Sequence, residues 1–331
     1  MRLWVLAFVL VGCAGNLHID PYAPASGGVI EAGGALEAGA VPDVRCAGAP
    51  ATGPAQGFRS WRQKLVAKLA RPDHRGYDLI SATDEPQVLA GKLAYGVIDK
   101  SLAHEDVELF ACIAGQWQGV GRTRSDGNGR FALALAPAQR LPVGLRDIYA
   151  SVVADRSGVR FLAYVAPRDS QLVISDVDGT LTASENLFVK AVVLGRNIKP
   201  QPGAAAALRA VAERGYQVVY VTARPDRYTD ATRQWLGNNG FPRGPVRLAD
   251  AWFVMPGSET IAYKQHTLKK LGFPIAAGVG NRKSDVAAYA AVGVPADRIF
   301  IKLPEYKGEL GTALTAGAAV GFGAYSALPV P

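Results

Sequence analysis

The chain has 331 residues, enough for two domains of ordinary size, and hydrophobic residues make up 49% of it. That apolar share can form a hydrophobic core, which excludes a chain that is unfolded throughout. The formal net charge of +8 favours anionic partners such as phosphates, lipid headgroups or nucleic acid, but it does not choose among them. A basic surface that only aids solubility is the alternative.

The first residues are typical of a targeting segment. Arg2 gives residues 1–12 a positive start, and the apolar run that follows is too short to span a bilayer. The tetrapeptide Leu10-Val11-Gly12-Cys13 resembles the lipobox of bacterial lipoproteins, in which Cys13 becomes a lipidated N-terminus. We therefore predict a signal peptide over 1–12 and a lipid anchor at Cys13, outside the cytoplasm in a bacterial cell envelope. An ordinary cleaved signal with an incidental cysteine is the alternative.

Residues 13–55 are rich in Gly, Ala and Pro, which predicts a flexible stalk. One cysteine of the stalk, Cys46, either pairs with Cys112 or both remain free thiols. No Cys/His cluster indicates zinc.

Residues 56–85 predict a basic amphipathic helix and a linker. One predicted face carries the large apolar side chains Phe58, Trp61, Leu65 and Leu69. With lysines and arginines around it, this face suits an anionic membrane. The favoured interpretation is that the apolar stripe docks on the domain that follows.

Residues 86–168 contain short apolar segments separated by turn residues, a pattern typical of a small antiparallel β-sandwich. The segments are Gly91–Ile98, Val107–Ile113, Arg130–Leu135, Asp147–Ala154 and Arg160–Val165. The run from Ser125 to Gly129 lacks the downstream Glu of a calcium loop, so it predicts a hairpin turn.

Residues 169–307 alternate predicted strands and helices, which indicates an α/β domain with a parallel sheet. The strands are Gln171–Ser175, Gln217–Thr222, Ala276–Gly280 and Arg298–Ile301, and the helices are Ala204–Arg214, Asp226–Asn238, Ser258–Leu271 and Ser284–Val292. Residues 308–331 are small, apolar and aperiodic, and predict a loosely packed tail.

Two carboxylates, Asp176 and Asp178, follow the first strand of this domain in the sequence Asp176-Val177-Asp178-Gly179-Thr180. At a strand terminus, carboxylates at i and i+2 can point to the same side and share a metal, or one can attack while the other moves a proton. Ligands of open parallel sheets bind just outside the carboxyl ends of the strands. A strand followed by a plain Asp-Gly turn is the alternative.

Further polar residues follow the later strands and complete a familiar pattern. Thr222 ends the second strand, Lys264 lies early in a helix, and Gly280-Asn281-Arg282-Lys283-Ser284-Asp285 follows a later strand. Together with the Asp pair, these residues resemble the motifs of the haloacid dehalogenase superfamily of phosphatases. The resemblance implies a Rossmann-like sheet, here preceded by the small β-sandwich. Lys269 and Lys270 are rivals for the role of Lys264.

The resemblance also implies a role for each residue. Asp176 is the nucleophile that forms an aspartyl-phosphate, and Asp178 is the general acid and base. Thr222 donates a hydrogen bond to the phosphoryl group, and Lys264 neutralises its charge. Mg²⁺ is the expected cofactor, with Asp176, Asp178 through its backbone carbonyl, Asn281 and Asp285 as the oxygen ligands.

Two narrower resemblances point to lipids. The motif around Asp176 and the segment Gly280-Asn281-Arg282 with Asp285 are similar to the lipins, the Mg²⁺-dependent phosphatidate phosphatases, which share the Asn. Residues 88–307 resemble the C-terminal region of the membrane-associated phosphatidylinositol transfer proteins, the retinal degeneration B family, on motifs such as Tyr220-Val221-Thr222-Ala223-Arg224-Pro225-Asp226. In those transfer proteins the acidic motif is degraded and the domain is regarded as a non-catalytic sensor of phosphatidic acid. This chain departs from them because both aspartates are present.

Spacing argues for an open site. Only about 20 residues separate Thr182 from the helix at Ala204, too few for a folded cap. We therefore predict a Mg²⁺-dependent phosphatase without a large cap, acting on phosphatidate at an anionic membrane surface. The alternatives are a phosphatidic-acid-binding module without turnover, or a phosphatase of soluble or nucleic-acid phosphomonoesters. No nucleic-acid partner is expected, and the sequence does not indicate the oligomeric state.

Overall fold

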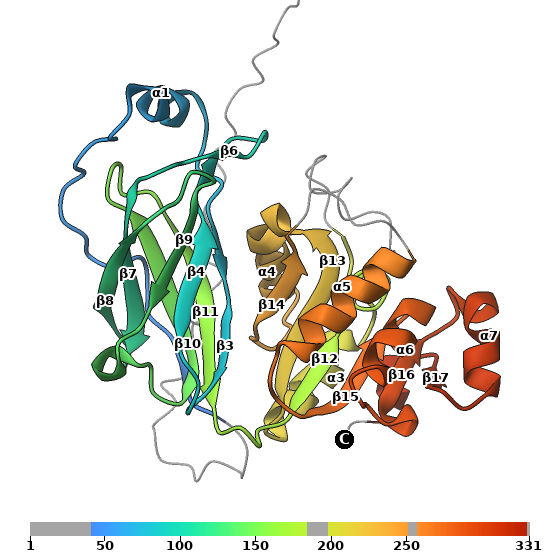
Figure 1. Ribbon diagram of the computed structural model, residues 1–331. Helices are drawn as coiled ribbons and strands as arrows, with labels where there is room; N and C mark the ends of the chain where they lie inside the picture. The colour runs from blue at the N-terminus through green and yellow to red at the C-terminus, as the bar shows by residue number, and fades with distance from the viewer. Residues whose placement is uncertain (1–40, 184–197, 251–256, 330–331) are drawn as a thin grey trace, which may run out of the picture.

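A computed structural model describes residues 41–183, 198–250 and 257–329 of the chain. It contains a β-sandwich and an α/β domain that lie side by side (Figure 1). This architecture confirms the predicted fold class. Within the described ranges, no helix is both long and apolar enough to cross a membrane.

The β-sandwich is built from one large sheet and two small ones. The large sheet has the order β3-β11-β10-β7-β8, with β1 pairing in parallel with β10, and the small sheets are β2-β4-β9 and β5-β6. The strands are β1 (Asp43–Val44), β2 (Arg75–Tyr77), β3 (Leu79–Ala82), β4 (Val88–Lys92), β5 (Ala94–Tyr95), β6 (Lys100–Ser101), β7 (Asp106–Ile113), β8 (Gln116–Arg124), β9 (Arg130–Ala134), β10 (Gly144–Val152) and β11 (Gly158–Ala166).

Alternation along these strands supplies the core of the sandwich. Val107, Leu109 and Ala111 of β7 are fully buried, whereas the residues between them are only half-buried, as expected when successive side chains point to opposite faces. They pack in one cluster with Leu89 of β4 and Phe161 of β11, which joins the two main sheets.

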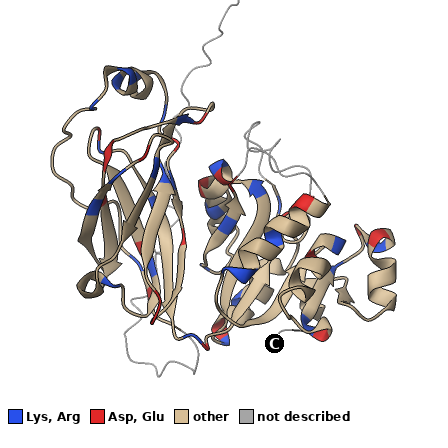
Figure 2. Ribbon diagram, in the orientation of Figure 1, with Lys and Arg blue, Asp and Glu red and all other residues tan. Residues whose placement is uncertain are grey.

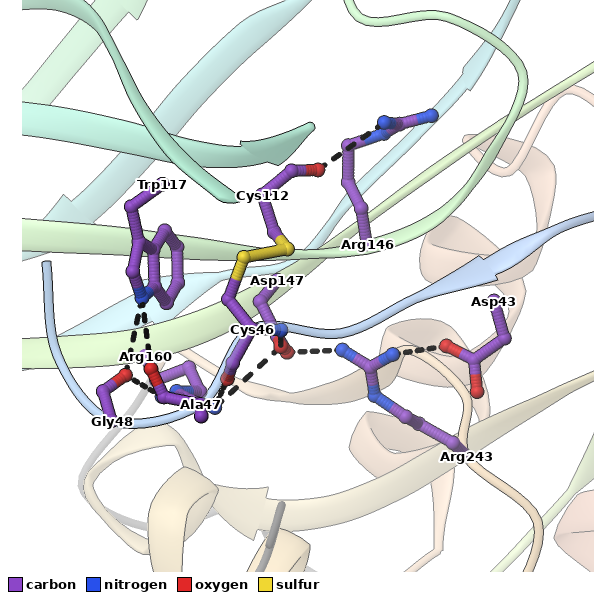
Figure 3. The surroundings of a disulfide bond; sticks show 10 residues. All are labelled: Asp43, Cys46, Ala47, Gly48, Cys112, Trp117, Arg146, Asp147, Arg160 and Arg243. Carbon is purple, nitrogen blue, oxygen red and sulfur yellow. Dashed lines mark hydrogen bonds and ion pairs between the residues drawn. A yellow bond between two sulfur atoms is a disulfide. The ribbon is translucent and has the colours of Figure 1, made fainter. Parts of the chain in front are cut away.

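The N-terminal part of the sandwich differs from the predicted stalk. Residues 41–55 include β1, and Cys46 forms a disulfide with Cys112 of β7 (Figure 3). Cys46 also donates its backbone N–H to Asp147 Oδ2 at 3.0 Å, and its carbonyl accepts from Arg160 at 3.0 Å. This segment is therefore a packed part of the sandwich. Residues 13–40 of the predicted stalk lie outside the described residues.

Helix α1 (Trp61–Leu69) begins after Ser60, whose hydroxyl accepts a hydrogen bond from the backbone N–H of Arg62. The face that packs on the sandwich carries Val66, Ala67 and Ala70. The predicted docking of the stripe of large apolar residues is wrong for three of its four members, since Trp61, Leu65 and Leu69 are exposed. Phe58, the fourth, packs against the sandwich core.

The α/β domain contains one parallel sheet of six strands in the order β14-β13-β12-β15-β16-β17. The chain starts at the central strand β12, moves out to β14, and returns to the other side at β15, so the order reverses beside β12. The strands are β12 (Leu172–Ser175), β13 (Gln217–Pro225), β14 (Val246–Ala249), β15 (Ile275–Gly280), β16 (Ile299–Lys302) and β17 (Val320–Phe322).

Helices cover both faces of this sheet. The helices are α3 (Ala204–Glu213), α4 (Thr229–Asn238), α5 (Ser258–Lys269), α6 (Lys283–Ala290) and α7 (Lys307–Thr315). Val173 of β12 packs with residues of α3 and α4, whereas its neighbours Leu172 and Ile174 pack with residues of α5, α6 and α7. This double coverage explains why the strands are continuous apolar runs.

The C-terminal residues are also more ordered than predicted. Instead of a loosely packed tail, residues 308–329 contain most of α7, the edge strand β17 and a short 3₁₀ turn at Tyr325–Ala327. The buried hydroxyl of Tyr325 donates to the carbonyl of Thr180 at 2.7 Å, beside the predicted catalytic residues.

A shared apolar cluster and a buried ion pair join the two domains. Tyr164 of β11 packs on Phe273 before β15, with ring centroids 5.7 Å apart. Asp78 of the sandwich accepts two hydrogen bonds from Arg233 of α4, at 2.9 and 3.0 Å. Arg243 of the α/β domain pairs with Asp147 and Asp43 of the sandwich, as Figure 3 shows. These contacts fix the sandwich against the side of the parallel sheet.

Candidate active site

Asp176 is placed at the carboxyl end of the central strand. Its backbone N–H donates to the carbonyl of Val279 on β15 at 2.9 Å, and its side chain is buried. The chain then turns at Gly179, whose φ of 73° lies in the left-handed region that glycine adopts without steric cost. Thr182 stabilises this turn, because its hydroxyl accepts a hydrogen bond from the Gly179 N–H at 2.9 Å.

Lys264 of α5 reaches this strand end and bridges two carboxylates. Its ammonium lies 2.7 Å from Asp176 Oδ1 and 2.5 Å from Asp285 Oδ1, and all three side chains are buried. The rivals for its role, Lys269 and Lys270, are exposed. The structure thus brings together three of the predicted site residues around one ammonium.

The charges of this trio perturb one another. Burial is the largest cause that raises the pKa of Asp176 to about 7; Lys264 lowers this pKa, and the neighbouring carboxylates Asp285 and Asp178 raise it. Burial alone would lower the pKa of Lys264, but the two carboxylates outweigh burial and raise its pKa above the ordinary value. Lys264 therefore stays protonated and places one positive charge between the two carboxyl groups.

Asn281 lies at the end of β15, beside the same carboxylates. Its backbone N–H and that of Arg282 both donate to Asp285 Oδ2 at 3.0 Å. Its side-chain oxygen lies 3.2 Å from the hydroxyl of Thr180, which also donates to Asp176 Oδ2 at 3.0 Å. The amide nitrogen of Asn281 is buried and has no hydrogen-bond partner. A buried amide group without a partner is costly, and it is a group to which a bound ligand can supply the missing acceptor.

Gly280 allows Asp285 to come this close to the strand. A Cβ atom at position 280 would lie 2.4 Å from Cβ of Asp285, so no larger residue fits without a shift. The close approach of Asp285 therefore requires glycine at the end of β15, just before Asn281.

Asp178, Thr222 and Arg224 form a second group at the same edge of the sheet. Asp178 accepts hydrogen bonds from Arg224 at 2.6 and 2.8 Å, one on each carboxylate oxygen, and from the hydroxyl of Thr222 at 3.0 Å. Arg224 is buried, and it also donates to Thr232 of α4 at 2.9 Å. A bidentate, charge-assisted pair of this kind is strong.

Sequence reasoning gave no role to Arg224 or to Thr180. The signal for Arg224 was present, because residues 222 and 224 of one strand point to the same face. Thr180 belongs to the turn after Asp178, and the sequence predicted the turn without the contact that its hydroxyl makes.

The donor set fits a magnesium ion in type. Mg²⁺ is usually bound through one or two carboxylates, with substrate oxygens and water completing its coordination. Asp176 and Asp285 supply two carboxyl groups, and Asn281 adds an amide. No group of three or more His, Cys, Asp or Glu in the described ranges is arranged to hold a metal. The predicted lipid anchor Cys13 lies outside those ranges.

The fold and this site define a class: an α/β domain with a parallel sheet and an acidic site at its carboxyl edge, preceded by a β-sandwich. Two family models describe the same two parts of the chain. The PITM 1-3 β-sandwich domain matches residues 72–165, and the PITM 1-3 LNS2 domain matches residues 173–302. Over these two ranges, the chain is similar to the two PITM 1-3 domains, in the same order.

Relatives from animals agree with the family models. Membrane-associated phosphatidylinositol transfer protein 3 of Homo sapiens is 29% identical over 258 residues, which are 76% of this chain and 26% of that protein. Protein retinal degeneration B of Drosophila melanogaster is 29% identical over 281 residues, 83% of this chain and 21% of that protein. The chain thus matches about a quarter or less of the length of these relatives.

Among solved structures, a putative β-phosphoglucomutase from Thermotoga maritima matches with a TM-score of 0.34 and 17% identity, covering 47% of this chain and 94% of that one. A likeness at this level adds no argument about function.

The relatives overturn the predicted location. They are animal proteins, namely membrane-associated phosphatidylinositol transfer proteins of human, mouse and rat and the protein retinal degeneration B of fruit fly, not bacterial lipoproteins. The prediction of a lipoprotein in a bacterial cell envelope is therefore wrong. The short apolar run at residues 3–11 misled the interpretation, because a signal-like pattern does not identify the organism that reads it.

Proposed function

We propose that the protein is a Mg²⁺-dependent phosphatase that hydrolyses phosphatidate or a related lipid phosphomonoester. The observation that carries the proposal is the bridge from Lys264 to Asp176 and Asp285 at the carboxyl end of β12. It supports the proposal because it combines a buried carboxylate, a fixed positive charge and a second carboxylate at one point. Phosphoryl transfer needs little beyond positioning and charge stabilisation of this kind.

In the proposed reaction, a carboxylate oxygen of Asp176 attacks phosphorus while the bond from phosphorus to the lipid oxygen breaks. Asp178 gives its proton to the leaving oxygen, which departs as the alcohol. A water molecule then attacks the aspartyl-phosphate, Asp178 takes one proton from it, and phosphate leaves as the carboxylate of Asp176 is restored. Lys264 and Thr222 stabilise the charge on the phosphoryl oxygens. When bound, Mg²⁺ held by Asp176, Asp178 through its carbonyl, Asn281 and Asp285 would screen the charge repulsion between nucleophile and phosphate.

A lipid substrate is supported by chemistry rather than by the residues of the site. The chain is basic overall, with a net charge of +8, which favours an anionic substrate surface. Relatives of the chain are named as phosphatidylinositol transfer proteins, and this name favours a phospholipid as the ligand class.

The test is phosphate release from phosphatidylcholine vesicles that contain phosphatidate, with Mg²⁺ present. We expect release by the wild type, loss of at least about a thousandfold in Asp176→Asn, and loss on addition of EDTA. Asp297→Asn is the matched control, because Asp297 is exposed and makes none of the contacts described for the site residues. Absence of release by the wild type, or equal release by Asp176→Asn, would refute the proposal.

The pairing of Asp178 with Arg224 favours a second candidate, a phosphatidate-binding domain without turnover. Both oxygens of Asp178 accept from Arg224, so Asp178 must leave this pair before it can carry a proton. If it stays paired, the domain binds the phosphate group without hydrolysis. Vesicle binding that persists in EDTA, together with no phosphate release, would identify this second function.

A further inference from the structure

An exposed apolar surface lies on the β-sandwich, on two neighbouring elements. Helix α1 exposes Trp61, Leu65 and Leu69 by 71%, 48% and 76%. These residues are four apart, so they form one stripe along the helix. The hairpin between β5 and β6 exposes Val97 and Ile98 by 81% and 73%. We call these five residues the apolar tip. They are the five most exposed large apolar residues in the described ranges.

The helix and the hairpin are held next to each other. The backbone N–H of Gly96 donates to the carbonyl of Arg71 at 2.9 Å, and Pro72 pairs with Tyr95 in an isolated β-bridge. Figure 1 shows α1 and the hairpin at the same end of the sandwich. The apolar tip is therefore a fixed part of the fold, because backbone hydrogen bonds join its two elements.

Basic side chains accompany the apolar tip. Helix α1 contains the exposed residues Arg62, Lys64 and Lys68 and no acidic residue. Arg71, just after the helix, and Lys100, in the hairpin, are also exposed. Figure 2 shows Lys and Arg in blue on the helix, and both blue and the red of Asp or Glu at the hairpin. A helix with exposed Trp and Leu next to Lys and Arg suits the interface of an anionic bilayer, where the apolar side chains can contact the lipid chains while the basic side chains contact the anionic headgroups. A protein partner would not require positive charge around the apolar residues.

The apolar tip is also linked to the candidate active site. Arg227, which follows β13 three residues after Arg224, donates to the carbonyl of Val97 at 2.8 Å. Asp99 of the hairpin pairs with Arg75, and Arg75 contacts Asp226 at 3.1 Å. The hairpin therefore touches the segment that continues from Thr222 and Arg224. In Figure 1 the carboxyl end of β13 points toward the same side as α1 and the hairpin.

We infer that the apolar tip inserts into the surface of an anionic membrane and thereby holds the carboxyl end of the parallel sheet against the lipid headgroups. The inference deepens the proposed function, because it assigns the surface through which a lipid substrate is presented. It also holds for a domain that only binds phosphatidate, since docking precedes any turnover.

The experiment is co-sedimentation of the full chain with vesicles of phosphatidylcholine alone and of phosphatidylcholine with phosphatidylserine, an anionic lipid that is not a phosphomonoester. Asp176→Asn is used as the parent, so that turnover plays no part in the result. We expect binding only to the anionic vesicles. We expect the double variant Val97→Ser/Ile98→Ser to bind about tenfold more weakly, because two inserted apolar side chains are lost.

Matched variants separate insertion from charge and from folding. Val320→Ser, on the exposed edge strand β17, should bind like the parent. Lys64→Gln/Lys68→Gln should weaken binding to anionic vesicles by about fivefold for each charge removed. Because these side chains are exposed, all variants should unfold at the temperature of the parent.

The inference is overturned if the parent binds neither vesicle, if Val97→Ser/Ile98→Ser binds like Val320→Ser, or if the apolar tip instead mediates self-association that the same variant abolishes. These outcomes are independent of the phosphatase assay. If the protein binds vesicles as expected but releases no phosphate, the inference that the apolar tip docks on the membrane is supported and the proposed enzymatic function is refuted.

Discussion

The buried pair between Asp78 and Arg233 gives the sharpest test of how the two domains are joined. Both side chains are almost completely buried, and Asp78 accepts four hydrogen bonds: two from Arg233, one from the backbone of Leu162 and one from that of Val246. Asp78→Asn keeps the shape but removes the charge and one acceptor oxygen. Breaking a buried pair by removing one partner costs about 3–5 kcal/mol, because the other charge is left buried without compensation.

The assay is urea unfolding of the full chain, followed by circular dichroism and tryptophan fluorescence. The matched control is Asp84→Asn, because Asp84 also pairs with an arginine, Arg168, but both side chains are exposed. An exposed pair contributes at most about 1 kcal/mol, so the control should unfold almost like the wild type. If Asp78→Asn also loses less than about 1 kcal/mol, the pair does not hold the interface together and the reasoning is refuted.

Three further outcomes are expected from buried groups elsewhere. Lys264→Met should lower the unfolding free energy by about 3–5 kcal/mol in urea, because it leaves two buried carboxylates without their ammonium, and an unchanged midpoint would contradict this. Burial lowers the pKa of His74 to about 4, so the native state binds fewer protons than the unfolded state, and stability falls as pH drops below 6.5. Between pH 7 and pH 5 the wild type should lose about 2 kcal/mol more than His74→Gln, and equal losses would show that His74 is not the group responsible. Cys112→Ala removes the disulfide to Cys46, which spans 66 residues of sequence, and should lower the unfolding free energy by about 4 kcal/mol. The reduced wild type should be as unstable as the variant; if the variant is still less stable than the reduced wild type, lost packing rather than the lost cross-link is the cause.

The sequence was most informative about residues at the ends of parallel strands. Because such strands all end at one edge of the sheet, the motifs after β12, β13 and β15 were bound to meet. The structure indeed brings Asp176, Lys264 and Asp285 into contact, with Asn281 alongside. What the motifs did not contain is which oxygen accepts from which donor, since that depends on the side-chain rotamers and on the local turn. For this reason Arg224 had no predicted role, although it contacts Asp178 more closely than Thr222 does.

The sequence was least informative where two surfaces compete for the same side chains. Periodicity predicted that Trp61, Leu65 and Leu69 share one face of a helix, and they do, but it could not tell which face the sandwich covers. The smaller residues Val66 and Ala67 pack there instead, together with Phe58. The same limit applies to residues 41–55, where Gly and Pro indicated a stalk but pairing with β10 and a disulfide decided the structure.

The two candidate functions differ in the freedom of one carboxylate. A guanidinium can bind a phosphate in the same bidentate way as a carboxylate, so an incoming phosphate competes with Asp178 for Arg224. Arg224 is the less mobile of the two, because it is buried and its other nitrogen is held by Thr232 of α4. The side chain of Asp178 is 20% exposed, whereas that of Arg224 is 3% exposed. In the proposed enzyme, release of the pair would therefore come from rotation of Asp178, the more exposed of the two side chains. A substrate that displaces Asp178 from Arg224 also frees the carboxylate to carry a proton, and so couples binding to catalysis. A ligand that leaves the pair intact can only be bound.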